Sequence, residues 1–223
     1  MSAEERRQQI MDIAARLFAE QGYHATTTRQ ISEACGINDS LLYQHFEGKE
    51  DLFIQTMSDL HTKMVDHWWE IAGYSENGLE ALREIHRDHI EDSYSAGSAV
   101  SAYHTELESI ADALITHYAE TFREVNDELE KLVRKGIKDG SIRPDVDPGQ
   151  VVMTVRAIAW FLHLPGLFKL KKYVPLDKAI GHLDAYLDSL STDKYMAENR
   201  AEKKEKVERE RGKAEEKRTA KAK

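Results

Sequence analysis

The chain has 223 residues, of which 41% are hydrophobic, and it carries a net charge of −9 and a single cysteine. This composition supports a buried core, but a lone Cys35 excludes an intramolecular disulfide. The longest mostly apolar stretch, residues 157–168, is shorter than the roughly 20 residues of a membrane span, and the first residues lack the apolar core of a signal peptide. We therefore expect an intracellular, cytoplasmic protein without a membrane-spanning segment.

The charge is uneven along the chain. Residues 194–223 contain 12 Lys/Arg against 7 Glu, whereas residues 1–50 contain 5 Lys/Arg against 8 Asp/Glu. An acidic N-terminal segment gives no electrostatic argument for a nucleic-acid partner. A DNA-binding function must therefore be argued from the geometry of a motif.

The first predicted helix covers residues 4–21, where apolar side chains recur every three or four residues along one face. Gly22 ends it, because glycine readily adopts the conformation that closes a helix C-terminus. A second helix is predicted from Thr27, since Thr27 and Gln30 have the spacing of a capping box. The residues expected to be buried in this second helix are Ile31, Ala34 and Cys35.

A tight turn at residues 36–38 leads to a third predicted helix, residues 39–46, for which Asn38 is a good N-cap. A fourth helix is predicted from Lys49 to Trp68, because its apolar stripe continues without interruption. Further helices are predicted at residues 79–94, 107–137, 147–164 and 175–190. Asp147 followed by Pro148 is a typical helix start.

These elements predict an all-α fold with a three-helix, N-terminal helix-turn-helix domain at residues 1–50. A larger helical domain for ligand binding and dimerisation would follow at residues 51–192. Residues 193–223 are strongly charged and offer no apolar face for docking, so we expect a solvated helix or a disordered tail there.

Residues 27–46 read as helix, glycine turn, helix. The third helix is about 12 Å long at 1.5 Å per residue, which matches the width of roughly 12 Å of the DNA major groove. Leu42 and Phe46 point to the core, whereas the other face is polar and suits base edges and phosphates. The side chains on that polar face are Asp39, Ser40, Tyr43 and Gln44.

The order of residues in this segment closely resembles the signature of the tetracycline-repressor-like (TetR) family of transcription regulators. The resemblance covers about 30 contiguous residues with correct spacing and rests on Gly22-Tyr23, Thr26-Thr27-Thr28, Ile31, Cys35-Gly36-Ile37-Asn38, Leu42-Tyr43, His45-Phe46, Lys49-Glu50 and Leu52. Ser32 departs from the alanine that the family usually has there, in a position expected to be half-buried.

The resemblance implies a role in DNA binding for a defined set of residues. Thr28 and Arg29 would touch phosphates, and Lys49 would bind a phosphate at a helix N-terminus. Asp39 would either accept a hydrogen bond from cytosine or cap its helix, and the cap is favoured. The full set is Thr28, Arg29, Asn38, Asp39, Ser40, Leu41, Tyr43, Gln44, His45 and Lys49.

Family members dimerise through their last two core helices, here residues 147–164 and 175–190. A two-fold dimer implies a near-palindromic operator. The resemblance therefore implies a homodimeric repressor that a small apolar or amphipathic inducer releases from DNA, although activation is also open. The identity of the inducer, the operator and the regulated genes are not readable from the sequence.

Candidate residues for the inducer site are aromatic or polar side chains within the helical stripes of the central domain. They are Trp68, Tyr94, Tyr103, His104, Tyr118, Phe122, Trp160, Phe161 and His163.

A helical-bundle metal protein or enzyme is the alternative from another class. His86 and His89 have a spacing that can share a metal, but no third ligand completes a tetrahedral set. We interpret them as part of a solvated charged face. No catalytic residue, metal site or cofactor is predicted, and the chain is not expected to be an enzyme.

Overall fold

The computed structural model describes residues 1–94, 111–167 and 170–197, with the backbone alone at 111–118, 120–121, 163 and 165–167. The helices in the described ranges are α1 (Ala3–Gln21), α2 (Thr28–Cys35), α3 (Asp39–His45), α4 (Lys49–Tyr74), α5 (Gly78–Ser93), α7 (Ala111–Asp139), α8 (Pro148–Leu167) and α9 (Leu176–Leu190). No β-strand occurs in these ranges, which confirms the all-α prediction.

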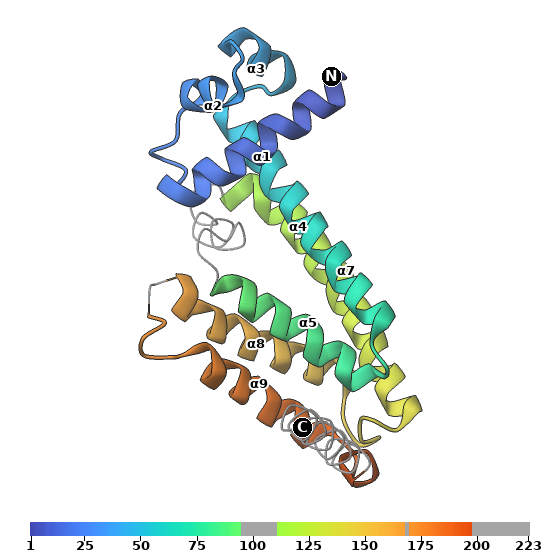
Figure 1. Ribbon diagram of the computed structural model, residues 1–223. Coiled ribbons are helices and arrows are strands. Elements are labelled where there is room, and N and C mark those ends of the chain that lie inside the picture. The colour runs from blue at the N-terminus through green and yellow to red at the C-terminus, as the bar shows by residue number, and fades with distance from the viewer. Residues whose placement is uncertain (95–110, 168–169, 198–223) are drawn as a thin grey trace, which may run out of the picture.

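The helices gather into a small head and a larger body that share α4 (Figure 1). Helices α1 to α3 form the head with the first turns of α4, and α4 then runs down to the body, where it lies beside α7. The head core consists of buried side chains from all four of these helices, among them Ile10, Phe18, Ile31, Leu42, Phe46, Leu52 and Phe53.

Local signals place the head helices as predicted. Thr27 and Gln30 form the predicted capping box, and Asn38 accepts a hydrogen bond of 2.8 Å from the backbone N–H of Leu41. Gly36 has φ of 67°, a left-handed conformation that glycine adopts without steric cost. The expectation that Ala34 is buried is wrong: α2 is short, and Ala34 lies on its exposed side.

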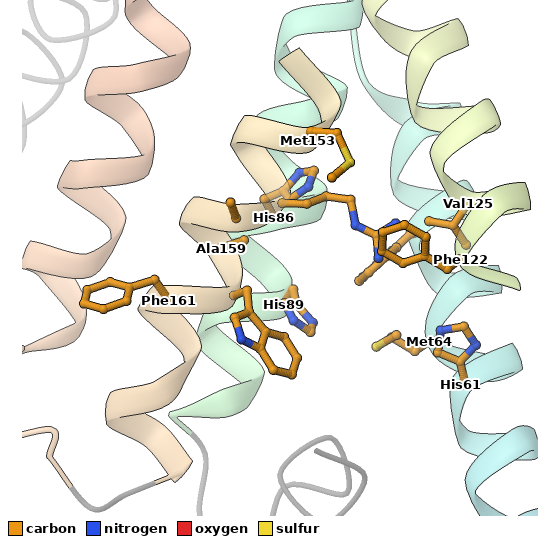
Figure 2. Close-up of a pocket in the computed structure, with 13 residues that line it drawn as sticks. His61, Met64, His86, His89, Phe122, Val125, Met153, Ala159 and Phe161 are labelled. Atoms are coloured by element: carbon orange, nitrogen blue, oxygen red, sulfur yellow. The ribbon is translucent and has the colours of Figure 1, made fainter. Parts of the chain in front are cut away.

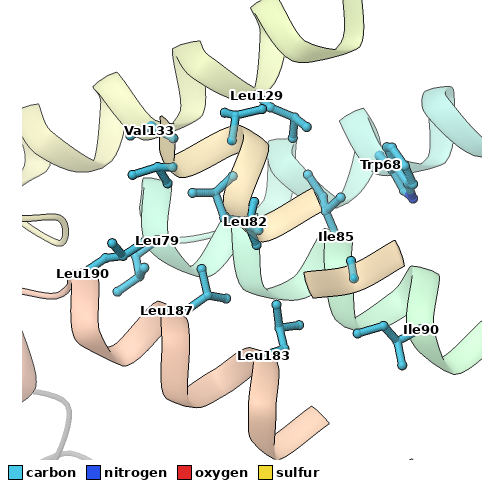
Figure 3. Packing of buried hydrophobic residues seen from close by; sticks show 14 of the residues in the cluster. Trp68, Leu79, Leu82, Ile85, Ile90, Leu129, Val133, Leu183, Leu187 and Leu190 are labelled. Atoms are coloured by element: carbon cyan, nitrogen blue, oxygen red, sulfur yellow. The ribbon is translucent and has the colours of Figure 1, made fainter. Parts of the chain in front are cut away.

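Helix α5 is the centre of the body and contacts α4, α7, α8 and α9. Figure 3 shows Leu79, Leu82 and Ile85 of α5 between side chains of α7 and α9. Arg83 fastens α5 to α9 through ion pairs of 2.7 Å to both Asp184 and Asp188. The body therefore combines an apolar core with a charged clamp at its edge.

Two boundaries differ from the sequence prediction. Helix α4 continues past Trp68 to Tyr74, and residues 193–197 are docked, because the Tyr195 hydroxyl donates a hydrogen bond of 2.7 Å to Glu80 on α5. The first turn of the segment that we expected to have no docking face is therefore held against α5 through Tyr195. The start of α8 is as predicted, with Asp147 accepting from the N–H of Gln150 at 2.8 Å.

Among the helices described, none is both long and apolar enough to cross a membrane.

Candidate DNA-binding surface and ligand pocket

Helix α3 presents a polar face to solvent and an apolar face to the head core. Leu42 is fully buried, whereas Tyr43 is 53% exposed. The other exposed predicted DNA contacts in and before this helix are Asn38, Asp39, Ser40 and Gln44, and Leu41 and His45 are half-buried. The structure thus brings these predicted residues together on one surface.

Asn38, not Asp39, is the residue that caps α3. Asp39 is the first residue of the helix and is exposed, where a carboxylate interacts favourably with the helix dipole. The expectation that Asp39 serves as the cap is therefore wrong, because the side chain that accepts a hydrogen bond from a backbone N–H at this helix end, that of Leu41, belongs to Asn38.

The start of α2 lies next to this surface. The hydroxyl groups of Thr28 and Tyr43 are 3.3 Å apart. Arg29 is exposed and forms an ion pair of 2.9 Å with Glu33, one turn along α2. The hydrogen bond to Glu33 is the main reason why the pKa of the Arg29 guanidinium is raised.

Lys49 holds the segment between α1 and α2. Its ammonium group donates hydrogen bonds of 3.0 Å to the backbone carbonyls of Tyr23 and Thr26 and lies 4.2 Å from the centre of the Tyr23 ring. This arrangement fixes the approach to Thr28. The proposed phosphate contact of Lys49 stays a prediction, and the loop support is a second role that the sequence did not reveal.

A pocket of about 470 Å³ lies in the body between α4, α5, α7 and α8 (Figure 2). Its size is within the range of roughly 300–1,000 Å³ that is usual for small-molecule sites. Its lining is largely apolar and consists of His61, Met64, Trp68, His86, His89, Phe122, Val125, Met153, Arg156, Ala157, Ala159, Trp160 and Phe161.

The interpretation of His86 and His89 as a solvated face is wrong. Both are buried and line the pocket, and the His89 ring meets the Trp68 ring edge-on at 5.4 Å. They share one face of α5 with Leu82 and Ile85, a helical spacing that the surrounding charged residues concealed. Burial lowers the pKa of His86 to about 4, and its Nδ1 donates to the carbonyl of Leu82 at 2.8 Å.

Only some of the residues predicted to bind the ligand line the pocket. Trp68, Phe122, Trp160 and Phe161 line the pocket, although Phe161 points away from the other labelled side chains in Figure 2. Tyr94 is not part of the lining, and its hydroxyl donates to the carbonyl of Val174 at 2.9 Å. Tyr103 and His104 lie outside the described residues, and Tyr118 and His163 lie on α7 and α8 where the backbone alone is described.

The sequence prediction missed several lining residues, above all His61 and Met64 on α4 and Arg156 on α8. Arg156 and Phe122 were separately visible in the sequence, but only the packing of α7 on α8 brings them together. Within the described part of the chain, no group of three or more His, Cys, Asp or Glu side chains could hold a metal ion.

A polar recognition helix on a glycine turn, joined by one long helix to a body with a small-molecule pocket, defines a ligand-responsive, DNA-binding regulator. The comparisons with known proteins give the family. Residues 10–56 match the family model of bacterial regulatory proteins of the tetR family. The HTH-type transcriptional repressor KstR2 of Rhodococcus jostii RHA1 is 34% identical over 159 residues, which are 70% of this chain and 76% of that protein.

The chain therefore belongs to the TetR family. Members of this family bind operator DNA and act as dimers, and they are regulators rather than enzymes. The alternative of a helical-bundle metal protein or enzyme is not supported.

Solved structures share the fold. The fatty acid degradation regulator FadR from Bacillus halodurans superposes with a TM-score of 0.66 at 20% identity, over 82% of this chain and 94% of that one. The ketosteroid transcriptional regulator KstR2 of Mycobacterium tuberculosis gives a TM-score of 0.56 at 22% identity, over 84% of this chain and 96% of that one. At these identities the likeness concerns the fold alone.

Proposed function

We propose that this protein is a cytoplasmic, homodimeric repressor that binds a near-palindromic operator and is released when a small apolar or amphipathic molecule fills the pocket of its body. The observation that carries the proposal is the course of α4. This single helix begins at Lys49 in the head and reaches Met64 and Trp68 in the pocket. A change in the pocket therefore has a direct mechanical route to the DNA-binding head.

One short stretch of α4 both contacts α1 of the head and lines the pocket of the body. Lys63 forms ion pairs of 2.8 Å with Asp59 and 3.5 Å with Asp12 of α1, and Gln8 of α1 donates to Asp59 at 3.0 Å. His61 and Met64, within the same turns of α4, line the pocket. A ligand that displaces the inner face of α4 will shift its outer face against α1.

The exposed face of α3 is the proposed reader of base sequence. Ser40 and Gln44 would contact base edges in the major groove, with Asn38, Asp39 and Leu41 bordering it. Thr28, Arg29, Tyr43, His45 and Lys49 would contact the phosphate backbone and fix the register of the helix. The described geometry supports this set because all members lie on α3 or on the segments packed beside it.

The proposed dimer interface is formed by α8 and α9. Helix α8 exposes Phe161 at 68%, on the side that points away from the other labelled pocket residues in Figure 2, and α9 exposes the small residues Gly181 and Ala185. Apolar side chains of this size are usual at the centre of protein interfaces. A two-fold axis through this face would place the recognition helices about 34 Å apart, one turn of DNA, or at a multiple of that distance.

The apolar lining supports an apolar ligand. Six of its side chains, Trp68, Phe122, Trp160, Phe161, Met64 and Met153, are aromatic or sulfur-containing. Two of the proteins with a similar fold are a ketosteroid transcriptional regulator, KstR2, and a fatty acid degradation regulator, FadR. Both kinds of compound are largely hydrocarbon, which agrees with this lining.

Release requires that the ligand bind the two conformations with different affinity, since equal affinities shift no equilibrium. The test begins with selection of tight-binding duplexes from a random oligonucleotide pool. We expect an inverted repeat bound by two chains. Binding of one chain to one duplex, or no duplex binding at modest salt, would overturn the proposal.

The second stage tests induction. A library of apolar acids, alcohols, amines and neutral ring compounds is screened for those that raise the melting temperature of the protein. We expect at least one such compound to lower the affinity for the selected operator. Equal operator affinities with and without every binding compound would contradict induction while leaving DNA binding intact.

A further inference from the structure

Positive charge is scarce in the head, and the positive side chains proposed to contact phosphates already have partners in the protein. Residues 1–50 carry 5 Lys/Arg against 8 Asp/Glu. Arg29 forms an ion pair with Glu33, and the Lys49 ammonium donates to two backbone carbonyls. Neutralisation of phosphates supplies a large share of the affinity of proteins for duplex DNA. The remaining positive side chains of the head, all on α1, are therefore candidates for further phosphate contacts.

Two of these side chains, Arg6 and Arg7, lie beside the helix-turn-helix motif. The guanidinium carbon of Arg7 lies 5.1 Å from the centre of the Phe46 ring, and Phe46 is the C-cap of α3. Arg6 lies within electrostatic reach of Cys35, the last residue of α2. Burial raises the pKa of the Cys35 thiol, and the positive charge of Arg6 opposes this rise. The two arginines therefore lie beside the C-terminal ends of α2 and α3.

Neutral groups hold both guanidinium groups in place. The Arg6 Nη1 donates a hydrogen bond of 2.7 Å to the side-chain oxygen of Gln9, and the Arg7 Nη1 lies 3.5 Å from the sulfur of Met11. Among the residues that the structure describes, no acidic side chain forms an ion pair with either arginine. Each guanidinium has five N–H donors, and both side chains are only partly buried. Their charges and most of their donors are therefore available to an anion from solvent.

The arginines lie at the end of the molecule that faces DNA in the proposed complex. Figure 1 shows the N-terminal end of α1 at the same end of the protein as α3, whereas the C-terminal end of α1 lies closer to the body. Thr28, a proposed phosphate contact, is the first residue of α2, and Cys35 beside Arg6 is the last. The 8 residues of α2 span about 12 Å at 1.5 Å per residue. This length is close to the width of roughly 12 Å of the major groove, which the two phosphate backbones border.

We propose that Arg6 and Arg7 form a second phosphate-binding edge of the head, which contacts the DNA backbone across the major groove from Thr28 and Tyr43. This inference rests on the proposed binding of DNA by α3, and it adds α1 to the contact surface. An arginine can pair with a phosphate through two parallel N–H groups. Contacts of this kind fix the position of the protein on DNA without reading bases, so the edge contributes affinity for any sequence.

The test measures duplex affinity by fluorescence anisotropy between about 50 and 200 mM salt, with the selected operator and with a random duplex. The first variant, Arg6→Gln, retains an amide that can bond to Gln9. The second, Arg7→Met, retains an apolar side chain over Phe46, and a third variant combines both changes. Each single variant should lose about 3- to 10-fold in affinity for both duplexes. The slope of log affinity against log salt should fall by about 1 for each arginine removed.

Two further variants separate a contact from a general effect of charge. Arg16→Met removes the same charge from an exposed position on α1, about 15 Å farther along the helix than Arg6, and it should keep the wild-type slope. Arg7→Lys keeps the charge but loses the planar guanidinium, so its slope should stay near that of the wild type. The melting temperatures of all variants show whether the head remains folded.

Ethylation interference on the operator locates the contacts. Some phosphates will weaken binding of the wild type when they are ethylated but will no longer affect the double variant, and these are the phosphates that Arg6 and Arg7 contact. Thr28→Val identifies the phosphates on the side of Thr28 in the same way. We expect the two sets to differ and to lie on opposite sides of the major groove.

The outcomes separate this inference from the proposed function. Unchanged slopes in both single variants, an equal effect of Arg16→Met, or the same set of phosphates for the double variant and Thr28→Val would each overturn the second edge, while DNA binding by α3 would stand. A lower melting temperature with an unchanged slope would show that the two arginines only support the fold. Failure of the wild-type protein to bind any duplex would contradict the proposed function itself, and the second edge with it.

Discussion

The side-chain oxygens of Thr28 and Tyr43 lie 3.3 Å apart and join the start of α2 to the middle of α3. Either hydroxyl can donate in this pair, so the other donor or acceptor sites remain available to a phosphate. The pair bridges the two helices of the motif on the side that faces solvent. It also orients the Tyr43 ring, which is otherwise half exposed.

Removal of the Tyr43 hydroxyl should weaken DNA binding without changing sequence preference. We expect Tyr43→Phe to lower the affinity about 2- to 10-fold for the operator and for a random duplex alike, because one hydrogen bond is worth about 0.5–1.5 kcal/mol. Fluorescence anisotropy with both duplexes measures this. Tyr74→Phe is the control, since Tyr74 is 90% exposed at the far end of α4. A loss confined to the operator would show that Tyr43 reads bases.

Lys49→Met tests two roles of one ammonium group. Loss of the hydrogen bonds to Tyr23 and Thr26 should lower the melting temperature of the protein. Loss of a phosphate contact should also weaken operator binding and reduce the slope of log affinity against log salt by about 1. An unchanged slope together with a lower melting temperature would mean that Lys49 does not contact a phosphate. Its role would then be only to support the loop between α1 and α2.

The head was more predictable from sequence than the body because its signals are local. The Thr27 capping box, the Gly36 turn and the Asn38 cap act within four residues, and the structure has all three. The pocket depends on contacts between distant helices. His86 and His89 sit among charged neighbours in sequence, and only the packing of α5 against α4 and α8 shows that their side of the helix is buried.

The same contrast holds for Arg156. In sequence it is one arginine within an apolar helix, and no local rule says what it faces. Its position over Phe122 depends on how α7 crosses α8. The exposed residues of α3 could be predicted from sequence, because a periodic pattern that defines the buried face of a helix also defines its opposite face. A cavity is formed by several helices together, so the pattern of one helix does not predict which of its residues line it.

Gly78→Ala should strongly destabilise the body. A Cβ on Gly78, the first residue of α5, would clash with the backbone of Gly136 and Leu132 in α7, and backbone atoms cannot move aside as a flexible side chain can. We expect a loss of at least about 1–3 kcal/mol in the free energy of unfolding, measured by urea titration. Gly73→Ala in α4, where nothing lies within 4 Å of the new Cβ, should be neutral or stabilising by up to about 1 kcal/mol. Equal effects of the two changes would show that α5 and α7 are less closely packed than described.

Ser32→Ala should stabilise the head. Ser32 is 1% exposed, not half-exposed as the sequence suggested, and its hydroxyl has no hydrogen-bond partner among the described residues. Replacing it removes a desolvated polar group, so the melting temperature should rise, with a gain of roughly 1 kcal/mol. Ser93→Ala is the matched control, because the buried Ser93 hydroxyl donates a hydrogen bond of 2.6 Å to Ile90, and it should lower the melting temperature. A fall for Ser32→Ala as well would mean that the Ser32 hydroxyl has a partner, such as a water.

The buried His86 should make the protein less stable as the pH falls. Its pKa is about 4 in the folded protein against an ordinary value of 6.5, so between these two pH values the unfolded chain takes up a proton that the folded protein does not. The contribution of His86 to the free energy of unfolding should be level above pH 6.5 and fall by about 1.4 kcal/mol for each pH unit down to about pH 4, roughly 3 kcal/mol in all at most, and then level off. His61, His89 and Arg156 line the same pocket, so the difference between wild type and His86→Leu is used to isolate the contribution of His86. Urea titrations from pH 7.5 to pH 4 should show a shallower fall for the variant, and identical pH profiles would mean that His86 is hydrated in solution rather than buried against Trp68.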